Sequence, residues 1–130
     1  IETQIIRDPA NRKRFKAVTG TNAGKHSKTI YHCIACYGKY SLIRFRLKTG
    51  RTHQIRVHSK FIGCPLLGDP VYGKKDDLFP EASLMLHSRL LKIWLPGESH
   101  IFQFKARIPD RFRNILSVLH KKFPKELITK

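Results

Sequence analysis

The sequence predicts an α+β fold in which a mostly antiparallel sheet is combined with a few helices. Residues 29–47 contain two runs rich in strand-forming residues around a short Gly38–Lys39 turn, and residues 84–108 repeat this pattern around Pro96–Gly97. Apolar residues recur with helical spacing in two further segments. A length of 130 residues fits one domain with one core.

The first third of the chain is expected to be mainly extended. Residues 1–8 read as a short extended segment, Asp8–Asn11 as a turn, residues 12–16 as a basic segment and residues 19–28 as a polar loop. Residues 29–37 favour a strand, and Tyr40–Leu47 alternates with a period of two, which is typical of a half-buried strand. Its two faces carry Leu42, Arg44 and Arg46, and Ile43, Phe45 and Leu47.

The remaining residues add helices and a second hairpin. A helix is expected from about Thr52 to Ile62, ending at Gly63, and residues 64–72 read as a loop. Residues 84–95 and 101–108 are expected to pair as strands, with Trp94 in the core. Pro109–Asp110 starts a last helix that runs to about Lys122. Its apolar stripe, which we expect to be buried, is Phe112, Ile115, Leu116 and Leu119.

The charge of the chain indicates a polyanionic partner. Lys and Arg number 26 against 9 Asp and Glu, a formal net charge of +17. Nucleic acid is the common partner of such a chain; a membrane surface would favour one basic amphipathic helix, whereas here the charge is spread along the sequence. Three cysteines, no secretory signal and no run of transmembrane length predict a reducing, cytoplasmic setting.

The most informative segment is Leu47–Tyr72. It places several basic and polar side chains at the start of the first helix, where backbone N–H groups and the helix dipole favour anions. Such a corner could hold a phosphate or position a carboxylate; a solvated basic face is the alternative reading of the same residues. The side chains concerned are Arg51, His53, Gln54, Arg56 and His58.

This segment resembles the signature of the RluA-like RNA pseudouridine synthases. The matching residues are TGRTHQIRVH at 49–58, followed by Gly63, Pro65, Gly68, Asp69, Tyr72 and Gly73 at the same spacing. Two weaker matches agree, around Arg7–Arg12 and at Leu86–Leu90. The resemblance implies that residues 1–130 form the C-terminal portion of a single pseudouridine synthase catalytic domain. Ile1 reads as a position within that domain, so we expect a fragment.

The resemblance also implies a reaction and its residues. The family isomerises uridine in RNA without a cofactor or metal: large-subunit ribosomal RNA is the first expectation and transfer RNA the second, with the enzyme a monomer. Arg56 matches the arginine that pairs with the catalytic aspartate, and Leu86 matches an apolar wall of the pocket. We expect Arg51, His53, Gln54 and His58 to contact RNA. No His-Arg-Leu-Asp stretch occurs here, so the isolated chain is expected to be inactive.

Other readings compete with this one. Cys33 and Cys36 suggest a metal or redox pair, but residues three apart on a strand point to opposite faces, so packed thiols are expected. His53 and His58 diverge by roughly 140° on a helix and do not form a zinc motif. His87 reads as a structural histidine. A non-catalytic basic RNA-binding module explains the charge but not the motif spacing, and a metal-dependent nuclease needs clustered carboxylates that the sequence lacks.

Overall fold

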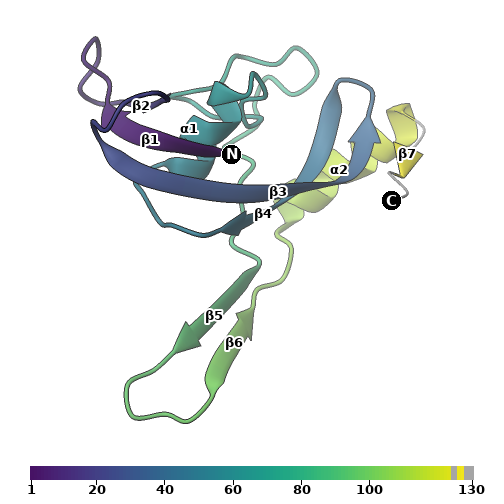
Figure 1. Ribbon diagram of the computed structural model, residues 1–130. Helices are drawn as coiled ribbons and strands as arrows, with labels where there is room; N and C mark the ends of the chain where they lie inside the picture. Colours follow the sequence, from purple (N-terminus) through teal and green to yellow (C-terminus); the bar gives the residue numbers. More distant parts are fainter. Residues whose placement is uncertain (124–125, 128–130) are drawn as a thin grey trace. The chain divides into compact units, whose positions relative to one another are not determined.

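The computed structural model describes residues 1–123 and 126–127, which fall into two compact units. The first comprises Ile1–Met85 together with a short strand near the C-terminus, and the second begins at Leu86 and includes the last helix. The elements of both units are labelled in Figure 1. Antiparallel strands with separate helices confirm the predicted α+β class.

The first unit contains an antiparallel sheet with the strand order β2-β1-β3-β4. Its strands are β1 (Glu2–Arg7), β2 (Phe15–Val18), β3 (Lys25–Tyr37) and β4 (Tyr40–Leu47). The strand β7 (Glu126–Leu127) pairs with β3 at Ala35 and Cys36. The predicted hairpin around Gly38 is confirmed, and Gly38 supports the turn with a φ of 58°, a conformation that residues with a Cβ rarely adopt.

Two features of this sheet differ from the prediction. The strand β2 was not predicted, because four residues are too few to establish an alternation. The strand β3 begins at Lys25, inside the expected polar loop, because β1 pairs with it from Glu2↔Lys28 to Ile5↔Lys25. Pairing with a strand distant in sequence thus extends a segment whose own composition favours a loop.

A β-bulge changes the expected geometry of the cysteines. The register of β3 on β4 shifts between Cys33 and Ala35, so that Cys33 opposes Ile43 and Cys36 opposes Ser41. Because Ile43 and Ser41 are two residues apart on a regular strand, both thiols lie on the same face. Their Sγ atoms are 3.7 Å apart. The expectation that they point to opposite faces was wrong, since it assumed an unbroken strand.

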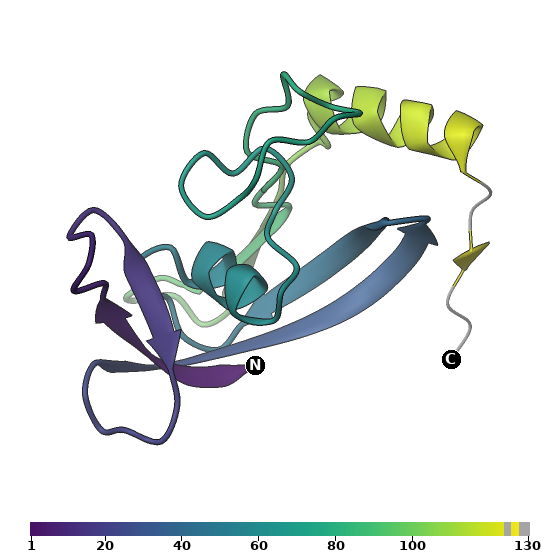
Figure 2. The same cartoon turned by 90° about the horizontal axis from the view of Figure 1, so that it is seen from above.

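The helix α1 (Gln54–Phe61) packs against β2 and β3, as seen from above in Figure 2. It begins two residues later than predicted, because His53 adopts a left-handed conformation with a φ of 54°. Gly63, with a φ of 78°, follows its end as expected. The small apolar core of this unit is formed by Ile5, Ala17, Val57 and Tyr72, with Phe15 and Val71 packed against it.

The second unit consists of the hairpin β5 (Leu90–Trp94) and β6 (Ile101–Lys105), followed by α2 (Asp110–Lys122). Both strands are shorter than predicted, and residues 84–89, which precede β5, form no regular secondary structure. Trp94 was expected in the core but is 59% exposed. Of the predicted α2 stripe only Leu119 is buried; Phe112, Ile115 and Leu116 are half-buried.

Candidate active-site corner at helix α1

Arg56 and Asp69 form a two-pronged ion pair at the centre of the candidate site. The Nε of Arg56 donates to Oδ2 of Asp69 at 2.9 Å, and its Nη2 donates to Oδ1 at 2.8 Å. The side chain of Arg56 is 14% exposed and that of Asp69 is fully buried. This arrangement fixes the plane of the guanidinium far better than a single charge contact would.

The charge on Asp69 is stabilised from several directions. Burial by itself would raise the pKa of this carboxyl group, but the Arg56 hydrogen bonds and the backbone N–H groups of Tyr72 and Val71 outweigh it and lower the pKa to about 2. Both N–H groups donate to Oδ1 at 2.9 Å. Asp69 is therefore an anion at neutral pH, and the Arg56–Asp69 pair carries no net charge.

Arg56 retains hydrogen-bonding capacity beyond this pair. A guanidinium has five N–H donors, and those on Nη1 make no hydrogen bond to a described residue. The guanidinium also lies 5.0 Å from the centre of the Tyr72 ring, a favourable position for a cation. The side chain is thus held in place on one edge and able to bind an acceptor on another.

Two glycines allow the loop after α1 to close around Asp69. Gly68 has a φ of 69°, and a Cβ there would lie 2.2 Å from the carbonyl oxygen of Ser83. A Cβ on Gly73 would lie 2.5 Å from the carbonyl oxygen of Asp69 itself. Neither distance is compatible with a side chain, so the Gly-Asp-x-x-Tyr-Gly spacing is a requirement of this loop.

His53 and Tyr72 form a second contact beside the ion pair. The hydroxyl of Tyr72 accepts a hydrogen bond from the backbone N–H of Phe15 at 2.9 Å and lies 2.9 Å from Nδ1 of His53. Its own proton is therefore available to Nδ1, which makes neutral His53 the acceptor. Burial, followed by the charge of Arg56, lowers the pKa of His53, in agreement with a neutral ring at pH 7.

Two of the residues predicted to contact RNA are inside the protein. Gln54 is 3% exposed and His58 is completely buried. Gln54 donates to the carbonyl of Lys28 and to Oγ1 of Thr29 and accepts from the Thr49 hydroxyl and the Arg51 N–H. Because these bonds join α1 to the sheet, Gln54 is a structural residue here, and direct contact with RNA is incompatible with this packing.

His58 serves the same purpose one turn further along α1. Its Nδ1 lies 2.8 Å from Oγ1 of Thr29, and its Nε2 lies 2.9 Å from Oγ1 of Thr3 and 3.0 Å from Oγ of Ser27. Burial lowers its pKa to about 4. A neutral imidazole closed off by three hydroxyls does not reach a phosphate, so the expectation of an RNA contact is corrected for this residue as well.

The other predicted residues lie in different surroundings. Arg51 is exposed, and its Nε donates to the carbonyl of His26 at 3.0 Å, which leaves the rest of its guanidinium accessible. Leu86 is half-buried in the second unit, where its carbonyl accepts from Arg111. Its neighbour His87 has a buried Nε2 with no hydrogen-bond partner among the described residues. Arg56 and Asp69 were each identified as motif residues, but their pairing with one another was not predicted.

Within the part of the chain that the structure describes, no three His, Cys, Asp or Glu side chains gather as metal ligands would. The Cys33–Cys36 pair lacks a third such ligand in the same residues, and burial raises the pKa of the Cys33 thiol. No described helix combines the length and apolar character required to cross a bilayer.

Comparison with known proteins shows what this chain is similar to. The family model described as RNA pseudouridylate synthase matches residues 1–60. A relative from Borreliella burgdorferi, "Ribosomal large subunit pseudouridine synthase D", is 42% identical over 93% of this chain and 36% of its own length. A protein of the same name from Neisseria meningitidis is 42% identical over 92% of this chain and 34% of its own.

The fold agrees with these matches. The structure of human RNA Pseudouridylate Synthase Domain Containing 1 superimposes with a TM-score of 0.73 at 24% identity, covering all of this chain and 54% of that one. The architecture is thus that of a pseudouridine synthase domain. The chain is similar to RNA pseudouridine synthases, in residues 1–60 to the family model and over 93% of its length to a relative. It spans about a third of the length of the curated relatives described above.

Proposed function

We propose that residues 1–130 are the C-terminal portion of a pseudouridine synthase catalytic domain that isomerises uridine in RNA. Large-subunit ribosomal RNA is the proposed substrate, in line with the names of the relatives, and transfer RNA is the second candidate. The protein would work in the cytoplasm as a monomer and without a cofactor.

The observation that carries this proposal is the guanidinium of Arg56, which is fixed in place and still has N–H donors without a partner among the described residues. Asp69 orients it through two hydrogen bonds, and the donors of Nη1 remain available for a second carboxylate. In the proposed reaction that carboxylate belongs to an aspartate outside these residues, which attacks the target nucleotide. The aspartate displaces the base from the sugar. The base then rotates and rejoins the sugar through carbon 5, which releases the aspartate, and carbon 5 loses a proton while N1 gains one.

The proposed contribution of Arg56 is electrostatic. A carboxylate in a closed pocket tends to take up a proton, and a protonated acid cannot attack; a nearby guanidinium favours the charged form. Because Asp69 neutralises only one edge of Arg56, we propose that the incoming aspartate binds the remaining N–H donors. Leu86 would supply an apolar wall, and Arg51 would bind RNA phosphate. The isolated chain would be inactive, because none of its carboxylates lies in the nucleophile motif.

The proposal is tested by substituting Arg56 in the full-length protein. Arg56→Ala should reduce turnover by at least about 100-fold, in the range seen when one group that stabilises developing charge is removed. Arg56→Lys should also be impaired, because a lysine cannot bind Asp69 and a second carboxylate in one plane. Turnover is measured as tritium release from RNA labelled at carbon 5 of uridine, with urea unfolding to confirm that each variant folds.

Arg51→Ala is the matched control. It removes the same side chain from an exposed position three residues before α1, so it should weaken RNA binding while leaving turnover at saturating RNA largely intact. Near-normal turnover by full-length Arg56→Ala would show that the wrong arginine is assigned. Turnover by residues 1–130 would contradict the external nucleophile. RNA binding by a full-length protein that never isomerises uridine would instead favour a non-catalytic RNA-binding module.

A further inference from the structure

The surface of the sheet opposite α1 carries an ordered group of basic side chains. Thr3, Ser27 and Thr29 face α1, because each contacts His58. Since side chains alternate along a strand, the intervening residues point away from the helix. Directly paired residues share a face, and the pairs concerned are Glu2↔Lys28, Ile30↔Arg46 and His32↔Arg44.

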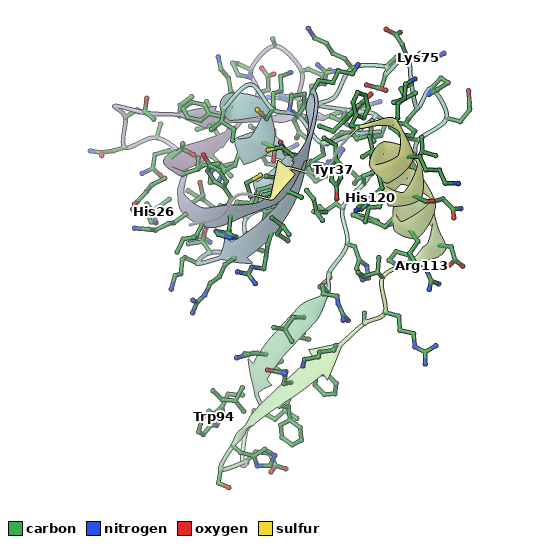
Figure 3. The ribbon with its side chains drawn as sticks, turned by 90° about the vertical axis from the view of Figure 1, so that its right-hand side faces the viewer. His26, Tyr37, Lys75, Trp94, Arg113 and His120 are labelled. Atoms are coloured by element: carbon green, nitrogen blue, oxygen red, sulfur yellow. The ribbon has the colours of Figure 1, made fainter. Side chains whose placement is uncertain are left out.

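We define the basic face as Lys28, Arg44, Arg46 and Lys48, which project from β3 and β4 and from the residue after β4. The backbone N–H of Lys48 donates to the carbonyl of Lys28, so the two strands remain paired to this point, and all four side chains are exposed. Figure 3 shows nitrogen-tipped side chains projecting from the side of the sheet that carries the label His26.

The positive charge of this face is largely uncompensated. Glu2 is the acid beside it, and its carboxylate already binds Lys28 Nζ and His26 Nε2, each at 2.8 Å. The side chains of Arg44, Arg46 and Lys48 make no ion pair with a described residue. Like charges at neighbouring positions of a sheet are mutually destabilising, so an anionic partner would relieve repulsion that the fold leaves in place.

Resting on the proposed function, we infer that the basic face binds the phosphate backbone of the substrate RNA, separately from the corner at α1. Arg44 and Arg46 on β4 and Lys48 directly after it occupy every second position of an extended segment, so successive residues of the row are about 7 Å apart. A rigid row with this spacing suits a chain of regularly spaced phosphates, each of which releases counterions when it is neutralised. The contacts would strengthen and orient binding without reading the base sequence.

RNA fits this face better than a membrane surface does. Peripheral membrane binding relies on apolar side chains inserted beside the basic ones, usually from an amphipathic helix. Here the basic residues stand on a flat pair of strands, and the large apolar side chain between them is Ile30, which is 44% exposed. A row of guanidinium and ammonium groups with one aliphatic neighbour favours phosphate contacts over insertion into lipid.

The test is the salt dependence of RNA binding by the full-length protein. The probe is a fluorescently labelled RNA hairpin, titrated between about 50 and 200 mM salt. The double substitution Arg44→Gln with Arg46→Gln should flatten the slope of log K against log[salt] by about 1.4 to 1.8, corresponding to two lost phosphate contacts. Lys121→Gln with Lys122→Gln, which removes equal charge from exposed positions of α2, should leave the slope near that of the unmodified protein.

A substitution that removes a negative charge should change the salt slope in the opposite direction and gives a second test. Glu2→Gln removes the carboxylate that binds Lys28, so this lysine becomes available and the slope should steepen by about 0.7 to 0.9. An unchanged slope in the Arg44/Arg46 variant, or equal flattening in the α2 control, overturns the inference whatever the turnover. If the same substitutions instead release the protein from phosphatidylserine vesicles and leave RNA binding intact, a lipid surface is the partner and the RNA assignment falls.

The failure of this inference is distinguishable from failure of the proposed function. Absence of tritium release from the unmodified full-length protein contradicts the enzymatic proposal but leaves the salt slopes interpretable. Normal tritium release at saturating RNA, together with a salt slope that the Arg44/Arg46 substitutions leave unchanged, contradicts only the basic-face assignment.

Discussion

At the residue scale, the side chain of His58 shows how burial and charge are linked in the first unit. Three hydroxyl groups surround its ring, and none of them can neutralise an imidazolium. The pKa of His58 is accordingly lowered from 6.5 to about 4, with burial as the main cause. His58 therefore joins α1 to β1 and β3 only in its neutral form.

This predicts a pH dependence of stability. Below pH 6.5 His58 is protonated in the unfolded chain, whereas in the folded protein it stays neutral until about pH 4. The unfolded state thus binds more protons in this window, and the free energy of unfolding should fall as the pH decreases through it, by at most about 3 kcal/mol from this group. Above pH 6.5 this contribution is constant.

The measurement is urea unfolding at several pH values between 7 and 4, compared with His58→Gln. The variant should be less stable at pH 7, because its amide cannot satisfy the same hydroxyls, and its stability should decline less as the pH falls. Asp69 titrates below this range, since its pKa is about 2. Parallel curves for the two proteins would show that His58 is not the group responsible.

Asp69 is the residue at which the sequence was least informative about geometry. Its place in the Gly-Asp motif was identified, but nothing in the order of residues indicates that its carboxylate binds Arg56 through both oxygens. The loop that returns Asp69 to α1 depends on Gly68 and Gly73. The pairing is therefore a property of the folded loop, although each of its residues could be selected from the sequence.

At the element scale, the bulge in β3 places the thiols of two cysteines side by side on one face of the strand. Cys33 and Cys36 are both half-buried, and their Sγ atoms are 3.7 Å apart. A bond between them would require about 2.05 Å, so the thiols are neighbours without being joined. Burial raises the pKa of Cys33, which keeps this thiol protonated at neutral pH.

We predict that this pair binds one trivalent arsenical per chain, because a reagent such as phenylarsine oxide bridges two thiols that lie close together on one face. The product is detected by intact-protein mass spectrometry under non-denaturing conditions. Cys36→Ser should abolish binding, whereas Cys64→Ser should have no effect, since Cys64 is exposed and belongs to a different segment. Failure of the unmodified protein to bind the reagent would contradict the bulged geometry.

At the scale of the whole molecule, the two units differ in how much apolar surface they cover. The first unit has a core beneath α1. In the second, the hairpin β5–β6 leaves several large apolar side chains exposed, and a hairpin of two strands has little independent stability in water. These side chains are Leu90, Leu91, Ile93, Trp94, Ile101 and Phe104.

The exposure of Trp94 can be checked directly, because it is the one tryptophan of the sequence. At 59% exposure, its fluorescence in residues 1–130 should resemble that of an indole in water, and acrylamide should quench it efficiently. Unfolding in urea should then change the emission maximum very little. A blue-shifted, shielded emission would show that the hairpin is covered, by a second copy of the chain or by another part of it.

The sequence by itself determined the α+β class, both hairpins and the two helices, and it indicated the segment that carries the candidate site. Local patterns were sufficient there: period-two alternation in Tyr40–Leu47, glycines at turns, and the spacing from Thr49 to Gly73. Basic charge predicts a nucleic-acid partner, because composition alone can support this expectation without knowledge of the fold.

Only the tertiary structure decided which of these side chains face the solvent and which bind one another. It buried Gln54 and His58, joined Arg56 to Asp69, brought Cys33 beside Cys36 and exposed Trp94. The physical reason is common to all four. Burial, bulges and ion pairs depend on which distant segments pack together, whereas periodicity and composition report only the preferences of neighbouring residues.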